Sequence, residues 1–249
     1  MKIVTPLCGL HALDSLFAAG AEEFYKDISE QELEENDYLE EAAKEIHARN
    51  GKIFIYLNIF VFYKLEMNAM EHYLEYLAKC RMDGVAVNIP ELVPIIKGLG
   101  MKAIASAQCE IQTGGLAQWY QKIGISRIIF PETIVYRDIQ SVSHTVPGLE
   151  YEVLLMRQDC FRGKGMETVP TCGQCALYHL LYSAVTSVKI LSNSEDWAML
   201  LSDINLTKQN IEIASQCDSE EEYLRKMILP EYRNIHCGER FSSYYPEIC

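Results

Sequence analysis

Short apolar runs alternate with amphipathic stretches along most of the chain. Eight runs have the length and β-branched or aromatic content of strands: KIVTPL (2–7), EFYK (23–26), KIFIYLNIF (52–60), GVAVNI (84–89), KAIASA (102–107), RIIFP (127–131), YEVLLM (151–156) and SVKILS (187–192). The stretches between them carry helical spacing, and several end in glycine, a common signal at a helix carboxyl end: LEEAAKEIHARNG, EHYLEYLAKC, ELVPIIKGLG, GGLAQWYQKIG and TIVYRDIQSVSH.

This alternation predicts an α/β fold with a parallel sheet. Eight strands with seven or eight helices, and no glycine-rich phosphate-binding sequence after the first strand, favour a (β/α)₈ TIM-barrel-like fold over a doubly wound sheet. The second interpretation is an incomplete or distorted barrel. We expect a barrel domain over 1–195 and an extension over 196–249, acidic and helical and then turn-rich and aromatic, which packs on the barrel as part of one structural unit.

Composition narrows the class of protein. The net charge of −13 opposes non-specific attraction to phosphate backbones, so nucleic acid is a disfavoured partner, although a local basic patch would still allow it. The start of the chain has no basic segment followed by a long apolar one, and no run reaches eighteen apolar residues, so we expect a cytoplasmic protein that does not enter the membrane. Nine cysteines, an odd number, argue for a reducing compartment. Cys8, Cys80 and Cys109 lie in or beside apolar runs and are expected to be buried.

Three cysteines fall close together after the seventh predicted strand. Cys160, Cys172 and Cys175 lie within the segment DCFRGKGMETVPTCGQC, the last two as Cys-x-x-Cys. This spacing lets thiolates converge on one metal or one iron–sulfur cluster. A redox dithiol and plain structural thiols are the alternatives, but the loop that separates the motif from its preceding strand, with a third cysteine in it, favours ligation.

A four-coordinate site needs one more ligand. Cys237, in a Cys-Gly pair near the end of the chain, is the first choice, followed by Cys217 and then by Cys8, Cys249 or a ligand of another type. Both a 4Fe-4S cluster and zinc accept four thiolates, so spacing alone leaves the metal open.

In a barrel, the active site forms where the strands end, so polar residues that follow the predicted strands are candidates. Each could also serve as a helix cap or a loop hydrogen bonder. Asn58 and Arg157 stand out, since the first is an amide within an apolar run and the second is a cation that could hold a carboxylate. The sequence contains no Gly-x-Ser-x-Gly elbow and no His-Glu-x-x-His motif. The catalytic or substrate-binding candidates are Asn58, Gln108, Glu132 and Arg157.

Several segments, in order, resemble the peptidase U32 family, also called the collagenase-like peptidases. They are KIVTPLCGLHALDSLFAAGAEEFY at the start, IHARNGKIFIYLNIF, the middle DGVAVNIPELVPIIKGLGMKAIASAQCEIQTGGLAQWYQKIGISRIIFPE, and SVKILSNSEDW in the place of the family's Lys-Ile-Glu-Gly-Arg element. The likeness covers roughly residues 1 to 195. Asn58, Gln108, Cys160, Cys172 and Cys175 match elements of the family.

The resemblance implies a TIM-barrel-like fold and, in many members, four cysteines that hold an oxygen-sensitive 4Fe-4S cluster. Such members include oxygen-independent ubiquinone hydroxylation proteins and RNA hydroxylases, while others carry a peptidase label. This chain departs from the family at three elements. Met156-Arg157 stands where His-Gly is usual, Glu132-Thr133 where Arg-Glu is usual, and Leu191 to Asn193 replaces Glu-Gly-Arg. It therefore resembles a divergent, short member.

These observations together favour an iron–sulfur protein that supports an oxygen-independent hydroxylation or a related redox modification of a small-molecule or peptide substrate. One alternative is a peptidase that acts on peptides or collagen-like substrates. Another is a non-catalytic partner subunit in which the metal only cross-links the cysteine-containing loop and the C-terminal extension to the barrel. The resemblance to paired hydroxylation proteins also suggests a heterodimer or homodimer with a related barrel.

Overall fold

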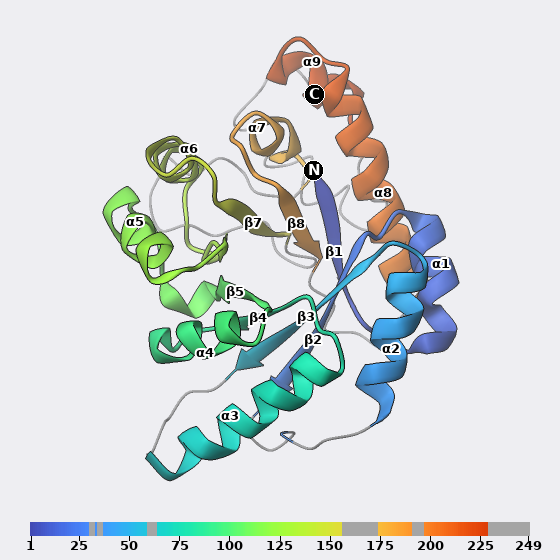
Figure 1. The fold of residues 1–249 in the computed structure, drawn as a ribbon. Helices are drawn as coiled ribbons and strands as arrows, with labels where there is room; N and C mark the ends of the chain where they lie inside the picture. Colours follow the sequence, from blue (N-terminus) through green and yellow to red (C-terminus); the bar gives the residue numbers. More distant parts are fainter. Residues whose placement is uncertain (30–32, 34–36, 59–63, 156–173, 191–196, 229–249) are drawn as a thin grey trace.

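The computed structural model describes residues 1–29, 33, 37–58, 64–155, 174–190 and 197–228 (Figure 1). Eight parallel strands form a closed barrel in chain order, and β8 pairs with β1 to complete it. The predicted (β/α)₈ barrel is confirmed. The strands are β1 (Lys2–Pro6), β2 (Glu23–Ser29), β3 (Lys52–Asn58), β4 (Gly84–Val87), β5 (Lys102–Ala105), β6 (Arg127–Ile129), β7 (Glu150–Leu155) and β8 (Ser187–Ile190).

Helices surround the barrel as an outer layer (Figure 1). They are α1 (Leu13–Ala19), α2 (Asp37–Ala48), α3 (Lys64–Lys79), α4 (Val93–Gly98), α5 (Gly114–Ile123), α6 (Tyr136–Thr145), α7 (Leu177–Leu181), α8 (Trp197–Ser215) and α9 (Glu220–Lys226). The α3 helix begins earlier than the predicted segment at 71–80, because Met67 and Met70 extend the apolar stripe of Leu74 and Leu77 toward the amino end.

Local sequence explains why these helices form and which face they bury. The buried residues of α2 are Leu39, Ala42, Ala43 and Ile46, a spacing that places them on one face against the barrel. The α5 helix begins where Thr113 accepts a hydrogen bond from the backbone of Leu116 and ends at Gly124, whose φ of 112° suits glycine.

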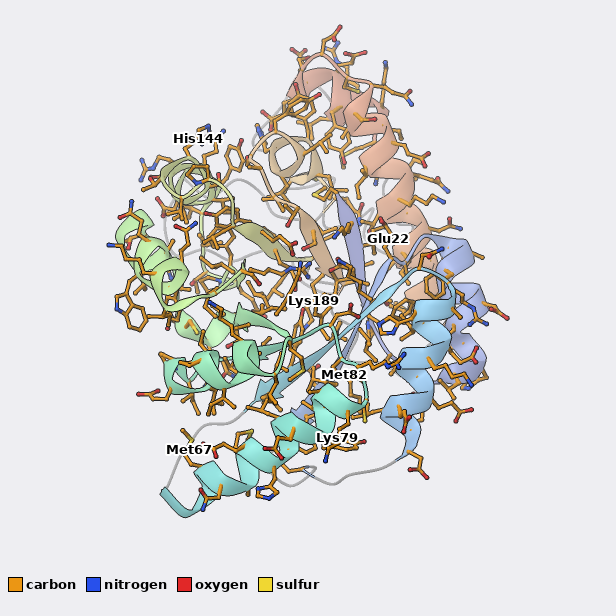
Figure 2. The ribbon with its side chains drawn as sticks, viewed as in Figure 1. Glu22, Met67, Lys79, Met82, His144 and Lys189 are labelled. Atoms are coloured by element: carbon orange, nitrogen blue, oxygen red, sulfur yellow. The ribbon has the colours of Figure 1, made fainter. Side chains whose placement is uncertain are left out.

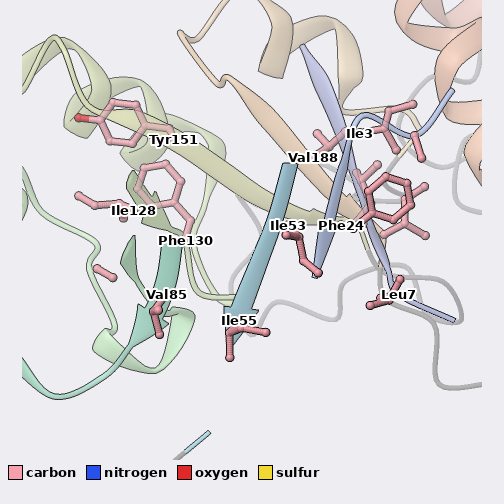
Figure 3. Packing of buried hydrophobic residues seen from close by; sticks show 14 of the residues in the cluster. Ile3, Leu7, Phe24, Ile53, Ile55, Val85, Ile128, Phe130, Tyr151 and Val188 are labelled. Carbon is pink, nitrogen blue, oxygen red and sulfur yellow. The ribbon is translucent and has the colours of Figure 1, made fainter. Parts of the chain in front are cut away.

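The main core lies between the barrel and the helices (Figure 3). Outward-facing strand residues such as Phe24, Ile53 and Val188 are fully or almost fully buried there. On the other side of the barrel, the rings of Phe130 and Tyr151 stack at a centroid distance of 5.4 Å. This shell holds the strands in place and leaves the barrel lumen to a second set of side chains.

The lumen is packed in its middle and ionic at its amino end. A separate apolar cluster fills the middle: Val4, Tyr25, Phe54, Tyr56, Ala86, Ile104 and Ile129. Gly84 allows β4 to approach its neighbours closely, since a Cβ there would lie 2.7 Å from the carbonyl oxygen of Lys102 and 3.2 Å from the ring of Phe54.

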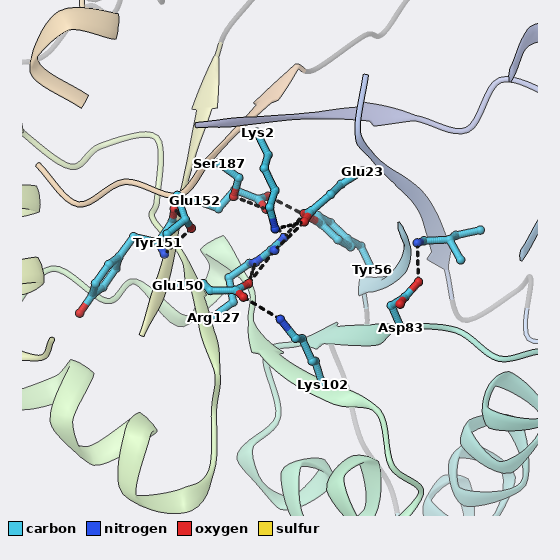
Figure 4. Close-up of polar contacts among 12 residues, drawn as sticks. Lys2, Glu23, Tyr56, Asp83, Lys102, Arg127, Glu150, Tyr151, Glu152 and Ser187 are labelled. Atoms are coloured by element: carbon cyan, nitrogen blue, oxygen red, sulfur yellow. Dashed lines mark hydrogen bonds and ion pairs between the residues drawn. The ribbon is translucent and has the colours of Figure 1, made fainter. Parts of the chain in front are cut away.

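A buried ion network closes the amino end of the lumen (Figure 4). Arg127, fully buried, contacts Glu23 at 2.7 Å, Glu150 at 2.7 Å and Glu152 at 3.1 Å. Lys2 pairs with Glu23 at 2.7 Å and Lys102 pairs with Glu150 at 2.6 Å. Three cations therefore face three carboxylates, so the network is electrically balanced although much of it is removed from water. At this end of a barrel such a cluster serves stability.

The network predicts a loss of stability in acid. Burial alone would raise the pKa of Glu150, but hydrogen bonds and charge from Lys102 and Arg127 outweigh it and lower the pKa to about 2. The pKa of Glu23 is lowered in the same way by Arg127 and Lys2, against the effect of burial. Because these pKa values are depressed on folding, the stabilisation is present above the ordinary value near 4.5 and is lost as the pH falls toward 2.

Urea unfolding between pH about 6 and about 2 measures this loss. The variant Glu150→Gln should show a shallower decline in the free energy of unfolding over this range, since it lacks one of the titrating groups. An equal decline in both proteins would contradict the assignment.

The carboxyl-terminal helices pack beside the barrel. The α8 helix contacts β1, α1 and α7, and α9 contacts α7 and α8. The division at residue 195 stays a prediction, and residues 229–249 of the predicted extension lie outside the described residues. Among the helices that the structure describes, none combines the length and the apolarity required to cross a membrane.

Candidate functional site

The predicted rim residues fall at the carboxyl ends of the strands where the structure describes them. Asn58 is the last residue of β3, in register with Ser29 of β2, and its side chain is outside the described part. Gln108 is exposed in the short 3₁₀ turn Ala107–Cys109 after β5, and Glu132 is exposed just after β6. Arg157 lies outside the described residues.

The loops that carry Gln108 and Glu132 are joined by a hydrogen-bonded side chain. Nε2 of Gln112 donates to the hydroxyl of Thr133 at 3.1 Å and to the carboxylate of Glu110 at 3.1 Å. Since β5 and β6 are neighbours in the barrel, this bond holds two adjacent loops of the rim together. Gln108 and Glu132 are therefore on one side of the barrel mouth, both open to solvent.

The cysteines have different environments. Cys175 is 4% exposed and is not in a disulfide, and it lies just before α7 within the main core. Cys160, Cys172 and Cys237 lie outside the described residues, so the predicted four-cysteine site stays a prediction. Burial is confirmed for Cys80, whereas Cys109 is only half-buried. For Cys8 it was wrong, because the residue follows the end of β1 in an exposed loop.

The residue beside Cys175 is fixed by a buried polar cluster. Gln174 donates from Nε2 to the hydroxyl of Thr207 at 2.9 Å, and its Oε1 accepts from Asn210 at 3.0 Å. Its carbonyl oxygen accepts from the hydroxyl of Tyr223. Asn210 also bonds both backbone groups of Ile228, at 2.8 Å and 2.7 Å. The carboxyl end of the Cys-x-x-Cys segment is thereby tied to α8, to α9 and to the backbone that follows α9.

Replacing Asn210 by Ala is expected to lower the free energy of unfolding by more than the loss of one side-chain amide usually does. The change leaves Oε1 of Gln174 and the two backbone groups of Ile228 without their partner. Each of these groups that water does not reach then costs about 1–3 kcal/mol. Urea unfolding measures the loss. Asn205→Ala, the same change at an exposed position of α8, is the matched control and should have a small effect. Equal losses in the two variants would show that the cluster does not anchor this region.

A lysine that the sequence analysis did not select occupies the barrel lumen. Lys189 of β8 is 5% exposed, and Figure 2 shows it near the middle of the barrel. Its Nζ lies 3.7 Å from the ring centroid of Tyr25 and 3.9 Å from that of Tyr56. The two rings stack at 5.1 Å. The ammonium therefore faces aromatic π-systems, which attract a cation.

The surroundings of Lys189 link it to the ion network below. The hydroxyl of Tyr56 donates to Glu152 at 2.8 Å, and that of Tyr25 donates to the carbonyl oxygen of Ile190 at 3.3 Å. Burial, with the Glu152 charge, raises the pKa of Tyr56 well above its usual range, so the phenol remains a donor. Burial lowers the pKa of Lys189, and the charges of Asp27 and Glu152 only partly oppose this.

A signal for Lys189 was present in the sequence. Lysine in the run Ser-Val-Lys-Ile stands at a position that must face the lumen if Val188 faces the helices. The rule for strand ends selects residues that finish a strand, and Lys189 lies within one. Arg127 was missed for a similar reason. It is the first residue of its strand, where a charged residue is usually exposed to solvent.

The sequence matches a known protein family. The sequence profile described as peptidase family U32 matches residues 10–169, more than half of the chain. The chain belongs to peptidase family U32. Within this U32 chain, the matched region runs from the turn before α1 through β7 and includes the predicted first cysteine, Cys160.

Curated relatives of this U32 chain are distant and longer. It is 23% identical to the uncharacterized protease MJ0090 of Methanocaldococcus jannaschii over 148 residues, 57% of this chain and 36% of the relative. It is 22% identical to the tRNA hydroxylation protein P of Helicobacter pylori (strain 26695) over 193 residues, 71% of this chain and 46% of the relative. The chain thus spans less than half the length of both.

Solved structures support the fold of this U32 chain. The U32 peptidase Mk0906 superposes with a TM-score of 0.58 at 14% identity, over 78% of this chain and 94% of that one. D-psicose 3-epimerase of Clostridium cellulolyticum H10 gives 0.56 at 10% identity, over 87% of this chain and all of that one. At such identities the likeness shows the barrel alone.

Proposed function

We propose that this U32 chain is an iron–sulfur protein that supports an oxygen-independent hydroxylation. The observation that carries the proposal is the similarity to the tRNA hydroxylation protein P over 71% of this chain. The proposed ligands are Cys160, Cys172, Cys175 and Cys237. The proposed substrate-binding residues at the mouth are Asn58, Gln108, Glu132 and Arg157.

The described residues are compatible with a cofactor that cysteine thiolates bind. Cys175 is a cysteine outside any disulfide and has a fixed position, because its neighbour Gln174 is bonded on both its side chain and its carbonyl. Within the described ranges, no three metal-binding side chains converge, so the other ligands must come from the remaining segments, where the other three cysteines lie. When bound, a 4Fe-4S cluster would supply one-electron chemistry.

The chain's own residues would bind and orient the substrate. The loops after β5 and β6 are braced by Gln112, which keeps the amide of Gln108 and the carboxylate of Glu132 at the rim. Below them the apolar lumen and its closed amino end keep water from crossing the barrel. Zinc in place of the cluster remains the alternative for the same ligands.

A peptidase is the second candidate, because the family description and the M. jannaschii relative both carry that term. Among the described histidines, His47 pairs with Asp83 at 2.9 Å and His179 with Glu220 at 2.6 Å. His72 and His144 bond carbonyl oxygens of their own helices. His47 and His179 are thus each held by a carboxylate, as the histidine of a catalytic triad is, and this keeps the peptidase as the second candidate.

Mass spectrometry of tRNA nucleosides tests the proposal. The chain is expressed without oxygen in a host that lacks its own tRNA hydroxylation protein. With prephenate present as the oxygen donor, the source that the resemblance to oxygen-independent hydroxylation proteins implies, the wild type and Cys80→Ser should each add one oxygen atom to a nucleoside, whereas Cys175→Ser should add none. Unmodified tRNA with all three proteins would contradict tRNA as substrate, and cleavage of peptides by Cys175→Ser would favour the peptidase.

A further inference from the structure

A cavity lies at the amino end of the barrel, where α8 packs beside α1 and β1. Its volume is about 390 Å³, and sites for small molecules typically measure about 300–1,000 Å³. Its floor is apolar and consists of the buried residues Ile3 and Ala21 with the partly buried Met1, Phe17 and Ile211. An occupant of this cavity therefore needs a small apolar body.

Three charged side chains line the same cavity: Glu22, Lys208 and Glu212. Figure 2 shows Glu22 beside α1 and α8. All three residues are exposed, and none forms an ion pair with another residue that the structure describes. Lys208 and Glu212 are one turn apart on α8, so the absence of a pair between them leaves both charges available to an occupant.

Gly20 determines how Lys208 reaches the cavity. A Cβ at this glycine would lie 2.6 Å from Cδ of Lys208, so the stem of the lysine packs directly on the glycine backbone. The φ of Gly20 is 118°, a left-handed value that favours glycine and that ends α1. The lysine side chain is thereby placed against the end of α1, at the wall of the cavity.

We propose that this cavity binds an apolar α-amino acid. Its ammonium donates hydrogen bonds to the carboxylates of Glu22 and Glu212, its carboxylate pairs with Lys208, and its side chain covers the apolar floor. A simple amine would leave Lys208 without a partner, and a simple carboxylic acid would meet two like charges. The amino-terminal residue of a peptide has no carboxylate beside its ammonium, so the charge pattern favours the free amino acid.

This site goes beyond the proposed function, because it lies at the opposite end of the barrel from the rim residues and requires no iron. It also shares a turn of α8 with the buried polar cluster. Asn210 bonds Gln174, while Lys208 and Ile211 line the cavity. The bound amino acid therefore contacts the helix turn that holds the segment next to Cys175.

Thermal unfolding with matched ligands tests the site. L-phenylalanine and L-leucine are titrated into the full chain. The controls are the amide of each, which lacks the carboxylate, and the N-acetyl derivative of each, which lacks the ammonium. At least one of the two amino acids should raise the melting temperature by about 2–4 °C, whereas its amide and its N-acetyl derivative should not.

Two variants assign the response to the cavity. Lys208→Met removes the charge but keeps an unbranched stem on Gly20, so it should fold as the wild type does and lose most of the shift. Lys44→Met, at an exposed position of α2, should keep the full shift.

The inference is overturned if neither amino acid stabilises the wild type, if a control compound stabilises it as much as its parent amino acid does, or if Lys208→Met keeps the full shift. Each comparison is made with and without ligand on one preparation of the protein. The iron content is therefore the same in both measurements, so failure here is separate from failure of the proposed function.

Discussion

Replacing Arg127 by Met is expected to reduce the free energy of unfolding by about 3–5 kcal/mol. The substitution removes the guanidinium that three carboxylates share and leaves Glu23 and Glu152 buried with unbalanced charge. Burial alone would lower the pKa of Arg127, but the charges of Glu152 and Glu23 raise it, so the wild-type group is charged at every accessible pH. Urea unfolding at neutral pH measures the difference.

Two further variants make this result interpretable. Arg127→Lys keeps the charge but loses the forked contacts, so it should fall between Arg127→Met and the wild type. Arg225→Met breaks an exposed pair with Glu221 in α9 and should change stability very little. If Arg127→Met is as stable as Arg225→Met, the ion network contributes nothing that apolar packing does not replace.

On the proposed function, replacing Cys175 by Ser is expected to remove most of the iron that the wild type would bind. The substitution exchanges a soft thiolate ligand for a hydroxyl, which holds an iron–sulfur cluster poorly. Cys80→Ser is a closely matched control, since neither cysteine is in a disulfide and Cys80 is 3% exposed against 4% for Cys175. Both variants replace one buried sulfur atom by oxygen, so they make the same change in packing, and only Cys175→Ser should lose iron. Equal iron in the two variants would exclude Cys175 as a ligand.

The barrel was predictable because its signals are local and repeated. Each apolar run is short, each helical stretch buries one face, and the count of eight admits few other topologies. The ends of elements were less predictable. The apolar pattern of RIIFP continues to Pro131, but β6 ends at Ile129, since proline has no N–H to donate to the ladder.

The lumen was the part that local pattern could not predict. Arg127, Glu23 and Glu152 come from three strands, and only closure of the barrel brings them together. The aromatic contacts of Lys189 depend on the same closure, because Tyr25 and Tyr56 come from β2 and β3. The rim residues Gln108 and Glu132 were located correctly by the rule for strand ends, although their roles stay predictions.

We propose that this U32 chain holds an iron–sulfur cluster through Cys175 and three other cysteines. Iron and acid-labile sulfide, measured per chain after purification without oxygen, test this proposal. We expect about four of each and a brown protein that loses its colour in air. A colourless protein with one zinc per chain, or with no metal, would contradict it.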